Sequence, residues 1–178
     1  MSATSSVENV HRLTKGAQLT VGGRPHVVDF SGDTSIGYDP AVLEQYRAGA
    51  ISTLPLLVHA DSCDGAGTTI GEVTWVMDPE RVPPAGFLSA VAPGQPFPGV
   101  QEYLLNINVT IPDLLPGITL RNALATGPVI LRNSNAVVFP PANDEYELVQ
   151  PIGLEDVRDP GPVLATIDSF PTIVNPLR

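Results

Sequence analysis

The residues best suited to hold a metal ion are His59, Asp61 and Asp64, at the end of an expected strand and in the glycine-rich segment after it. Divalent cations accept carboxylate ligands, and alternation along a strand would point His59 and Asp61 to the same side. The spacing does not match the EF-hand pattern, and no second histidine pair supports a zinc or iron site. The simpler interpretation is that both aspartates are turn formers. We therefore expect no metal and no other cofactor.

The sequence offers no catalytic constellation. It lacks a G-x-S-x-G nucleophile elbow, a phosphate-binding glycine loop and a dinucleotide fingerprint. The single cysteine, Cys63, has acidic neighbours, which raise the pKa of a thiol and keep it unreactive. The carboxylate pairs Glu145 with Glu147 and Glu155 with Asp156 lie in polar, turn-like sequence that is typical of solvated surface. We name no catalytic residue and expect a protein that is not an enzyme.

The charge composition limits the classes of partner. The chain has a formal net charge of −10 and a pI of about 4.5, yet only 16% of its residues are charged, against about 25% in ordinary globular domains. An acidic chain whose only lysine is Lys15 cannot neutralise nucleic-acid phosphates or anionic lipids. We exclude both as partners. The cores of protein interfaces are also poor in charge, which favours self-association or docking onto another protein. The alternative is a monomer with a neutral, proline-rich surface.

The sequence also bears on the compartment. One cysteine cannot form an intramolecular disulfide, and residues 1–13 lack the basic and apolar regions of a signal peptide. No run of about 18 apolar residues could form a membrane-spanning helix. We therefore expect a cytoplasmic protein.

The segment that best defines the fold is 101–111, QEYLLNINVTI, in which apolar Tyr103, Leu105, Ile107, Val109 and Ile111 alternate with mostly polar residues. A period of two predicts a strand with one buried face. Further short strands are separated by Gly, Pro, Asn and Asp, which is typical of an all-β, antiparallel sandwich of jelly-roll or immunoglobulin type. The other expected strands are 18–21, 24–30, 51–60, 70–77, 86–92, 118–125, 129–131, 136–139, 145–150 and 163–167.

Turn and helix signals complete the expected fold. Gly22 and Gly23 predict a two-residue hairpin turn between 18–21 and 24–30, because both can adopt positive φ. One short helix is expected near 40–48, with Asp39 as its N-cap and Gly49 after its end.

We expect one β-sandwich domain at 17–168, flanked by an extended N-terminal arm at 1–16 and an extended C-terminal tail at 169–178. The segment 82–101 is uncharged and rich in proline, so it predicts a long, semi-rigid loop that could be a contact surface.

These observations favour a structural or interaction protein, a subunit of a homo-oligomer or larger assembly of shell, decoration or appendage type. The arm at 1–16 and the loop at 82–101 would make its contacts. One alternative is a β-module that binds a carbohydrate or another small ligand through Trp75, Tyr103 or Phe97. The third hypothesis is a metal-dependent enzyme that uses His59, Asp61 and Asp64.

Overall fold

The fold was taken from a computed structural model, which describes residues 5–78, 80–81 and 85–177. Within this part of the chain a single sheet of 13 antiparallel strands accompanies one helix, α1 (Pro40–Arg47). The prediction of an all-β, antiparallel, sandwich-like fold with one short helix is confirmed. The strands are β1 (Ser6–Val21), β2 (Arg24–Tyr38), β3 (Thr53–Gly67), β4 (Gly71–Met77), β5 (Ala85–Ala92), β6 (Gln95–Leu105), β7 (Ile107–Thr110), β8 (Thr119–Asn122), β9 (Val129–Ala136), β10 (Asp144–Leu148), β11 (Ile152–Asp156), β12 (Val163–Ser169) and β13 (Thr172–Pro176).

The sheet closes on itself twice, because β12 also pairs with β1 and β3 also pairs with β5. One closed circuit, which we call ring 1, consists of β1, β2, β3, β4, β7, β8, β11 and β12. The other, ring 2, consists of β1, β2, β3, β5, β6, β9, β10 and β13. The strands on opposite sides of the sandwich therefore belong to one continuous sheet. The two rings share β1, β2 and β3, which form a common wall.

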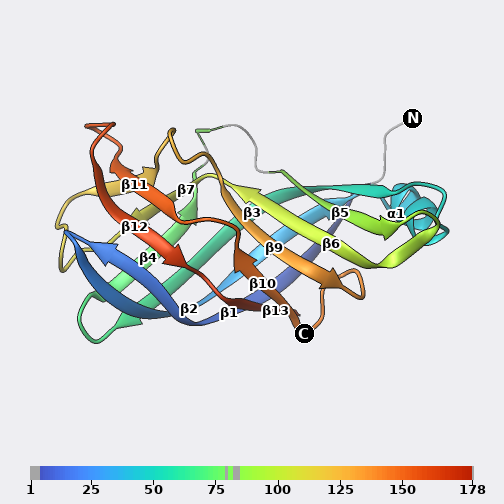
Figure 1. The fold of residues 1–178 in the computed structure, drawn as a ribbon, viewed down its shortest axis with the longest axis horizontal. Helices are drawn as coiled ribbons and strands as arrows, with labels where there is room; N and C mark the ends of the chain where they lie inside the picture. The colour runs from blue at the N-terminus through green and yellow to red at the C-terminus, as the bar shows by residue number, and fades with distance from the viewer. Residues whose placement is uncertain (1–4, 79, 82–84, 178) are drawn as a thin grey trace.

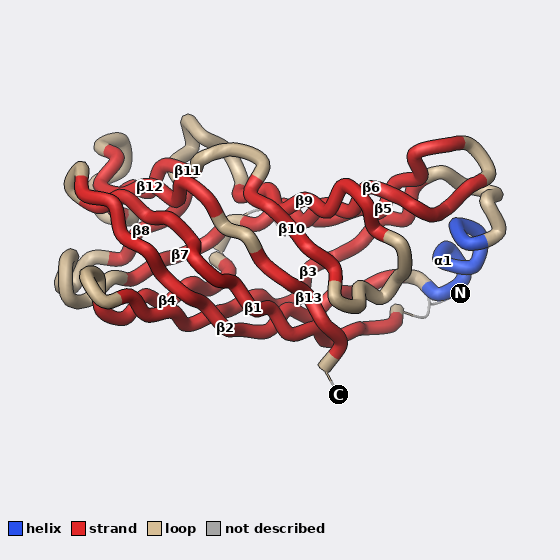
Figure 2. The backbone as a smooth tube through the Cα atoms, turned by 60° about the horizontal axis from the view of Figure 1, so that its bottom comes forward, coloured by secondary structure: helices blue, strands red, loops and turns tan. Residues whose placement is uncertain are grey.

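The shared strands run along the length of the molecule, with ring 1 at one end and ring 2 at the other (Figure 1). The first half of β1 pairs with β13 through 10–14, and its second half pairs with β12 through 18–21. In the same way β3 pairs with β5 through 53–57 and with β4 through 62–67. Figure 2 shows how β1 and β2 pass beneath both groups of strands.

An aromatic cluster fills the interior between the two rings. Phe170, which lies between β12 and β13, contacts Trp75 at a ring-centroid distance of 4.7 Å and Phe30 at 5.2 Å. All three side chains are buried. Large aromatic groups bury much apolar surface and prefer such tilted contacts, so this cluster stabilises the junction of the rings.

Helix α1 lies at the end of ring 2 that is farthest from ring 1 (Figure 1). Asp39 accepts hydrogen bonds from the first backbone N–H groups of the helix, as its N-cap position predicts. The buried face consists of Leu43 and Tyr46. Tyr46 donates its hydroxyl hydrogen bond to Pro96 O at 2.6 Å and packs edge-on against Phe97, so the helix is held onto β6.

Two further predictions are confirmed. Gly22 and Gly23 both have positive φ and join β1 to β2. In 101–111 the five alternating apolar residues are buried, although Asn106 divides the segment into β6 and β7. Since β6 belongs to ring 2 and β7 to ring 1, this segment carries the chain from one ring to the other.

The segments predicted as an extended arm at 1–16 and an extended tail at 169–178 are largely strands of the sheet in the residues described. Residues 6–16 belong to β1, and 172–176 form β13, which pairs with β1 and β10. Residues 1–4 and 178 lie outside the described residues. In β1 the buried face includes the polar residues Arg12 and Thr14, and the order of both segments depends on pairing with other strands, so local composition understated it.

Within 82–101 the strand predicted at 86–92 is confirmed as β5. The loop predicted for the rest is wrong from residue 95 onward, because 95–105 form β6, which pairs with β5; residues 82–84 are outside the described part. The glycine-rich segment 61–67 is the end of β3 rather than a turn. The predicted strands 129–131 and 136–139 are replaced by one strand, β9, and β11 was not predicted. No helix in the described part of the chain is long and apolar enough to cross a membrane.

Candidate functional site

The three residues predicted as a metal site do not come together. Asp61 is buried inside the sheet, whereas His59 and Asp64 are exposed on its outer face. A bulge opposite Ser35 and Ile36 leaves His59 without a paired residue, so the expected alternation is broken between 58 and 60. Among the residues that the structure describes, no group of three His, Cys, Asp or Glu side chains could hold a metal ion.

Asp61 is instead the centre of a buried hydrogen-bond network. Its carboxylate accepts from Arg12 Nη2 at 2.9 Å, Thr34 Oγ1 at 2.6 Å and Trp75 Nε1 at 2.8 Å. The four residues lie on β1, β2, β3 and β4, so the network ties together neighbouring strands of the shared wall and ring 1. Arg12 also lies 5.6 Å from the centroid of the Trp75 ring, a favourable cation–π distance.

The path of Arg12 across β2 depends on a glycine. Gly32 is paired with Arg12 on one side and with Cys63 on the other, and a Cβ at Gly32 would overlap the backbone and side chain of Cys63. The missing side chain lets Arg12 reach over β2 to Asp61. Burial raises the pKa of the Cys63 thiol to about 12, although the positive charge of Arg12 acts to lower it. Cys63 is therefore an unreactive core residue, in agreement with the expectation from its sequence.

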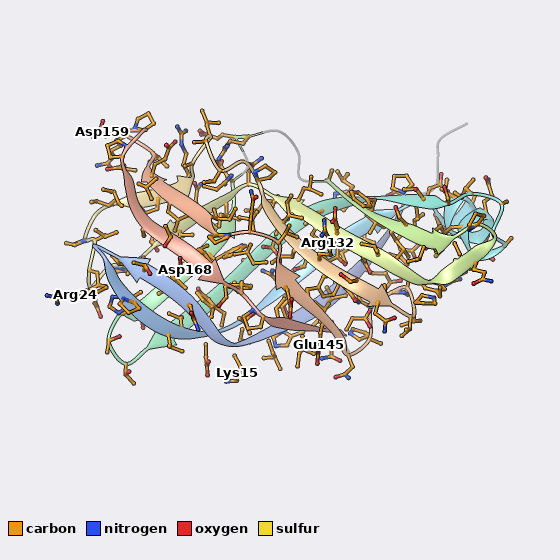
Figure 3. The ribbon with its side chains drawn as sticks, in the orientation of Figure 1. Lys15, Arg24, Arg132, Glu145, Asp159 and Asp168 are labelled. Carbon is orange, nitrogen blue, oxygen red and sulfur yellow. The ribbon has the colours of Figure 1, made fainter. Side chains whose placement is uncertain are left out.

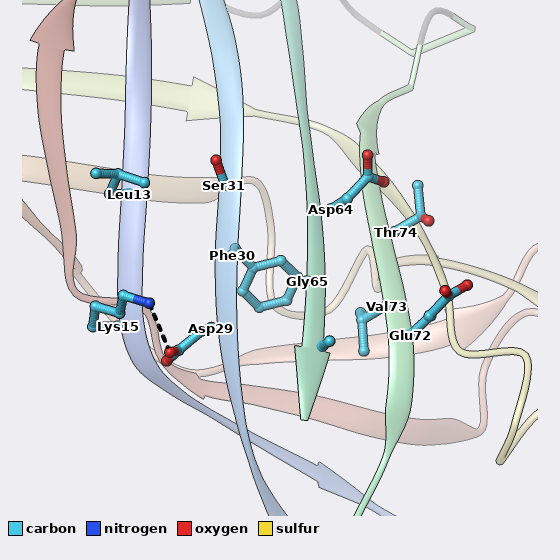
Figure 4. A pocket seen from close by; sticks show the side chains of 11 residues that line it. Leu13, Lys15, Asp29, Phe30, Ser31, Asp64, Gly65, Glu72, Val73 and Thr74 are labelled. Carbon is cyan, nitrogen blue, oxygen red and sulfur yellow. Dashed lines mark hydrogen bonds and ion pairs between the residues drawn. The ribbon is translucent and has the colours of Figure 1, made fainter. Parts of the chain in front are cut away.

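A groove of about 650 Å³ lies on the outer face of β1–β4. Two rows of outward-facing residues border it (Figure 4). One row crosses the four strands and consists of Leu13, Ser31, Asp64 and Thr74. The other consists of Asp29, Ala66 and Glu72, together with Lys15. Between them runs the row of Phe30, Gly65 and Val73: the side chains of Phe30 and Val73 are buried, and Gly65 has none. The groove is therefore shallow and has a backbone floor.

The groove is acidic. Lys15 Nζ pairs with Asp29 Oδ2 at 2.9 Å, and Gly16 N also donates to Asp29, which together hold the pKa of that carboxyl below its ordinary value. Asp64 and Glu72 have no hydrogen bond or ion pair to any described residue. A molecule in the groove meets net negative charge, which disfavours anions.

Beside the groove, Ser31, His11 and Asp33 form a chain of hydrogen bonds. His11 Nδ1 lies 2.7 Å from Asp33 Oδ1, and His11 Nε2 lies 3.2 Å from Ser31 Oγ. Ser31 and Asp33 are two residues apart on β2 and face outward, and Asp33 is directly opposite His11 on β1. The order hydroxyl, imidazole, carboxylate is that of a serine nucleophile with its base and the base's orienting group.

A second opening lies in the wall of ring 2, where β9 and β10 diverge. The two strands pair only at Glu147 with Arg132 and at Leu148 with Leu131, although β9 continues to Ala136. A polar pocket of about 450 Å³ fills the gap beyond this pairing. Figure 3 shows Arg132 and Glu145, which belong to the two flanking strands.

Buried polar groups gather at this pocket. Asn133 and Asp144 line it, and both are at least nine-tenths buried. Gln101 is paired with Asn133 across β6 and β9, and its amide donates to Tyr103 OH at 2.6 Å. Tyr103 in turn stacks on Tyr146 at a centroid distance of 5.3 Å.

Two atoms of this cluster, Gln101 Oε1 and Asp144 Oδ2, have no hydrogen-bond partner among the residues that the structure describes. The Tyr146 hydroxyl, by contrast, interacts with Tyr103 and Asn133. Burial raises the pKa of Asp144 to about 6, and burial likewise raises the pKa of Tyr103 and Tyr146. At pH 7.5 the cluster therefore presents one carboxylate and two neutral phenols.

The aromatic residues predicted to contact a ligand have different positions. Trp75 is buried and bonded to Asp61, and Phe97 packs against Tyr46; neither is among the residues that line the β1–β4 groove or the ring 2 pocket. Only Tyr103 lies in the polar cluster of ring 2. The sequence reasoning missed Gln101 and Asp144, because an isolated polar residue in a strand does not reveal which neighbours the sheet will give it.

Comparison with known proteins indicates the fold alone. No family model matches the chain, and no curated protein matches it. A solved structure that is similar is that of DynF from the dynemicin biosynthesis pathway of Micromonospora chersina, with a TM-score of 0.77 and 19% sequence identity. The match covers 96% of this chain and 80% of that chain.

Proposed function

We propose that the protein binds a small polar molecule in ring 2, through the opening between β9 and β10. The observation that carries this proposal is a pair of unpartnered buried polar atoms: Asp144 Oδ2, on a residue that lines the pocket, and Gln101 Oε1, whose residue is paired with the pocket residue Asn133. A buried polar group without a partner costs about 1–3 kcal/mol. Both groups are accounted for if a bound molecule supplies their hydrogen bonds.

The charges at the opening indicate the class of ligand. Asp144, Glu145 and Glu147 line the pocket, and the guanidinium of Arg132 is already paired with Glu102. Ionised Asp144 and the Gln101 oxygen accept hydrogen bonds, so the ligand must donate them. A primary ammonium group suits the site best, because it carries several N–H donors and a positive charge.

The similarity to DynF supports a role with small molecules. DynF is described as part of a biosynthesis pathway, and the match extends over nearly all of the present chain. A fold that serves in small-molecule biosynthesis in another protein is compatible with ligand binding here.

The proposal can be tested by titration with n-butylammonium, using NMR of tyrosine rings labelled with ¹³C at pH 7.5. We expect the resonances of Tyr103 and Tyr146 to shift with millimolar amine, while Tyr46, under helix α1, stays unchanged. Asp144→Asn keeps the shape of the side chain and removes its charge, so it should weaken binding at least tenfold.

Two controls make this test specific. Asp159→Asn makes the same change at the far end of ring 1 (Figure 3) and should leave the affinity unchanged. Neutral n-butanol should bind much more weakly than the amine. Equal affinity of Asp144→Asn and the unaltered protein for n-butylammonium, or no tyrosine shift at all, would contradict the proposal.

Assembly into a homo-oligomer is a second candidate function, favoured by an exposed apolar row. Val7, Gly37 and Leu57 are paired side by side on the outer face of β1–β3, and Val7 and Leu57 are 49% and 42% exposed. The occupant would be a second copy of the chain. Light scattering should then show a dimer that Leu57→Glu dissociates, and a monomer across micromolar concentrations would rule this candidate out.

A further inference from the structure

We propose that Ser31 is a nucleophile, activated by His11 and Asp33, that accepts acyl or phosphoryl groups from uncharged or cationic donors in the β1–β4 groove. This site lies on the outer face of the sheet and is separate from the ring 2 opening. Its chemistry does not depend on ligand binding there.

The hydrogen bonds set the roles of the three residues. With Asp33 Oδ1 2.7 Å away, we assign the proton of the neutral ring to His11 Nδ1, which donates a hydrogen bond to the carboxylate. The Nε2 atom then keeps its lone pair and accepts a hydrogen bond from the Ser31 hydroxyl at 3.2 Å. Imidazole in this tautomer is the base that a serine nucleophile requires.

Neighbouring serines on the same face lack this arrangement. The Ser35 hydroxyl donates to Asn9 Oδ1 at 2.6 Å. Ser62 is paired with Asp33 across β2 and β3 and is exposed, and none of its hydrogen bonds in the described structure involves a histidine. Ser31 alone of these three combines a base with a position on the border of the groove.

The groove determines which donors can approach. Asp64 and Glu72 lie on its two borders with no paired cation, so anionic donors are repelled. With an ester, Ser31 Oγ bonds to the carbonyl carbon while its proton passes to His11 Nε2. The bond to the leaving alkoxide then breaks, and the alkoxide takes that proton from His11. A water molecule then attacks the acyl carbon and gives a proton to His11. The bond from that carbon to Ser31 Oγ breaks, Ser31 takes the proton from His11, and the acid is released.

The regular sheet also limits the rate. The backbone of β2 is paired with β1 on one side and β3 on the other, so its N–H groups are used in the ladders. No backbone donors remain there to stabilise the oxyanion, and one such donor contributes about 10²–10³ in rate. We therefore expect both the modification of Ser31 and its turnover to be slow, because each step forms an oxyanion.

Labelling with diisopropyl fluorophosphate tests the proposal directly. Ser31 Oγ would form a bond to phosphorus, fluoride would leave, and the serine proton would pass to His11. We expect one adduct by intact mass, located on Ser31 by peptide mapping. Ser31→Ala should abolish the adduct, and Asp33→Asn should slow its formation at least tenfold by releasing the imidazole from its orientation.

Ser62→Ala is the matched control, since it removes an exposed hydroxyl from the same face and should leave the rate unchanged. Circular dichroism verifies that each variant is folded. An adduct shared equally by Ser31 and Ser62, an unchanged rate in Asp33→Asn, or no adduct at all would overturn the proposal. None of these outcomes affects amine binding in ring 2.

Discussion

At the scale of single residues, Asp61 has the most partners from different strands. Its carboxylate, on β3, accepts hydrogen bonds from Arg12 on β1, Thr34 on β2 and Trp75 on β4. The side chains of the Arg12–Asp61 ion pair are 3% and 0% exposed. Such a pair contributes little net stability compared with apolar residues, but removal of one partner leaves an uncompensated charge in the interior.

Asp61→Asn should therefore be strongly destabilising. Loss of the carboxylate leaves the Arg12 guanidinium buried without a counter-charge, and we expect a loss of about 3–5 kcal/mol in the free energy of unfolding. Urea denaturation followed by Trp75 fluorescence measures it as a lower midpoint. Asp64→Asn, an exposed change on the same strand, should stay within about 0.5 kcal/mol. Equal midpoints for the two variants would show that the network is not needed for stability.

Residue chemistry was only partly predictable from sequence. The unreactive character of Cys63 followed from its acidic neighbours, and burial strengthens it. The role of Asp61 did not, because its partners Arg12 and Trp75 are far away in sequence and meet it only through strand pairing. The Ser31, His11 and Asp33 chain was missed for the same reason: nothing in sequence places His11 opposite Asp33.

At the scale of elements, the predictable parts were those with local signals. The glycine pair at 22–23, the helix with its Asp39 cap and the alternation in 101–111 all depend on nearby residues. Long-range pairing decided the remainder. The prolines of β6 suggested a loop, yet that strand pairs with β5 and β9. Strand β11 was not predicted because it contains the charged residues Glu155 and Asp156. In the structure Glu155 is buried and forms an ion pair with Arg121.

Helix α1 offers a test at this scale. The Asp39 carboxylate accepts from Ala41 N at 2.8 Å, and N-cap replacement by alanine costs about 1 kcal/mol. We expect Asp39→Ala to lower the free energy of unfolding by that amount, measured by urea denaturation. Glu44→Ala changes an exposed residue of the same helix, whose ion pair with Arg47 contributes only a few tenths of a kcal/mol. An equal loss in both variants would contradict the assigned cap.

At the scale of the whole molecule, the rings are not separate units along the chain. After the shared strands, the chain alternates between them: β4 belongs to ring 1, β5 and β6 to ring 2, β7 and β8 to ring 1, and β9 and β10 to ring 2. Strands β11 and β12 return to ring 1, and β13 completes ring 2. No single cut of the chain would release one intact ring.

We therefore expect one cooperative unfolding transition. Trp75 reports on ring 1 by fluorescence, and the labelled rings of Tyr103 and Tyr146 report on ring 2 by NMR. The two urea profiles should have the same midpoint, which is the usual test of two-state behaviour. Midpoints that differ by more than the experimental error would show that one ring can unfold while the shared wall persists.

The position of β1 in this topology also affects how the protein is made. Strand β1 leaves the ribosome before its partners, and β12 and β13 are the last strands of the described chain to follow it. At about 5–20 residues per second, the edge of β1 that does not pair with β2 waits many seconds for those partners. Unpaired edges invite intermolecular pairing. Yield in the cell should therefore depend on chaperones that shield these edges until synthesis of β13 is complete.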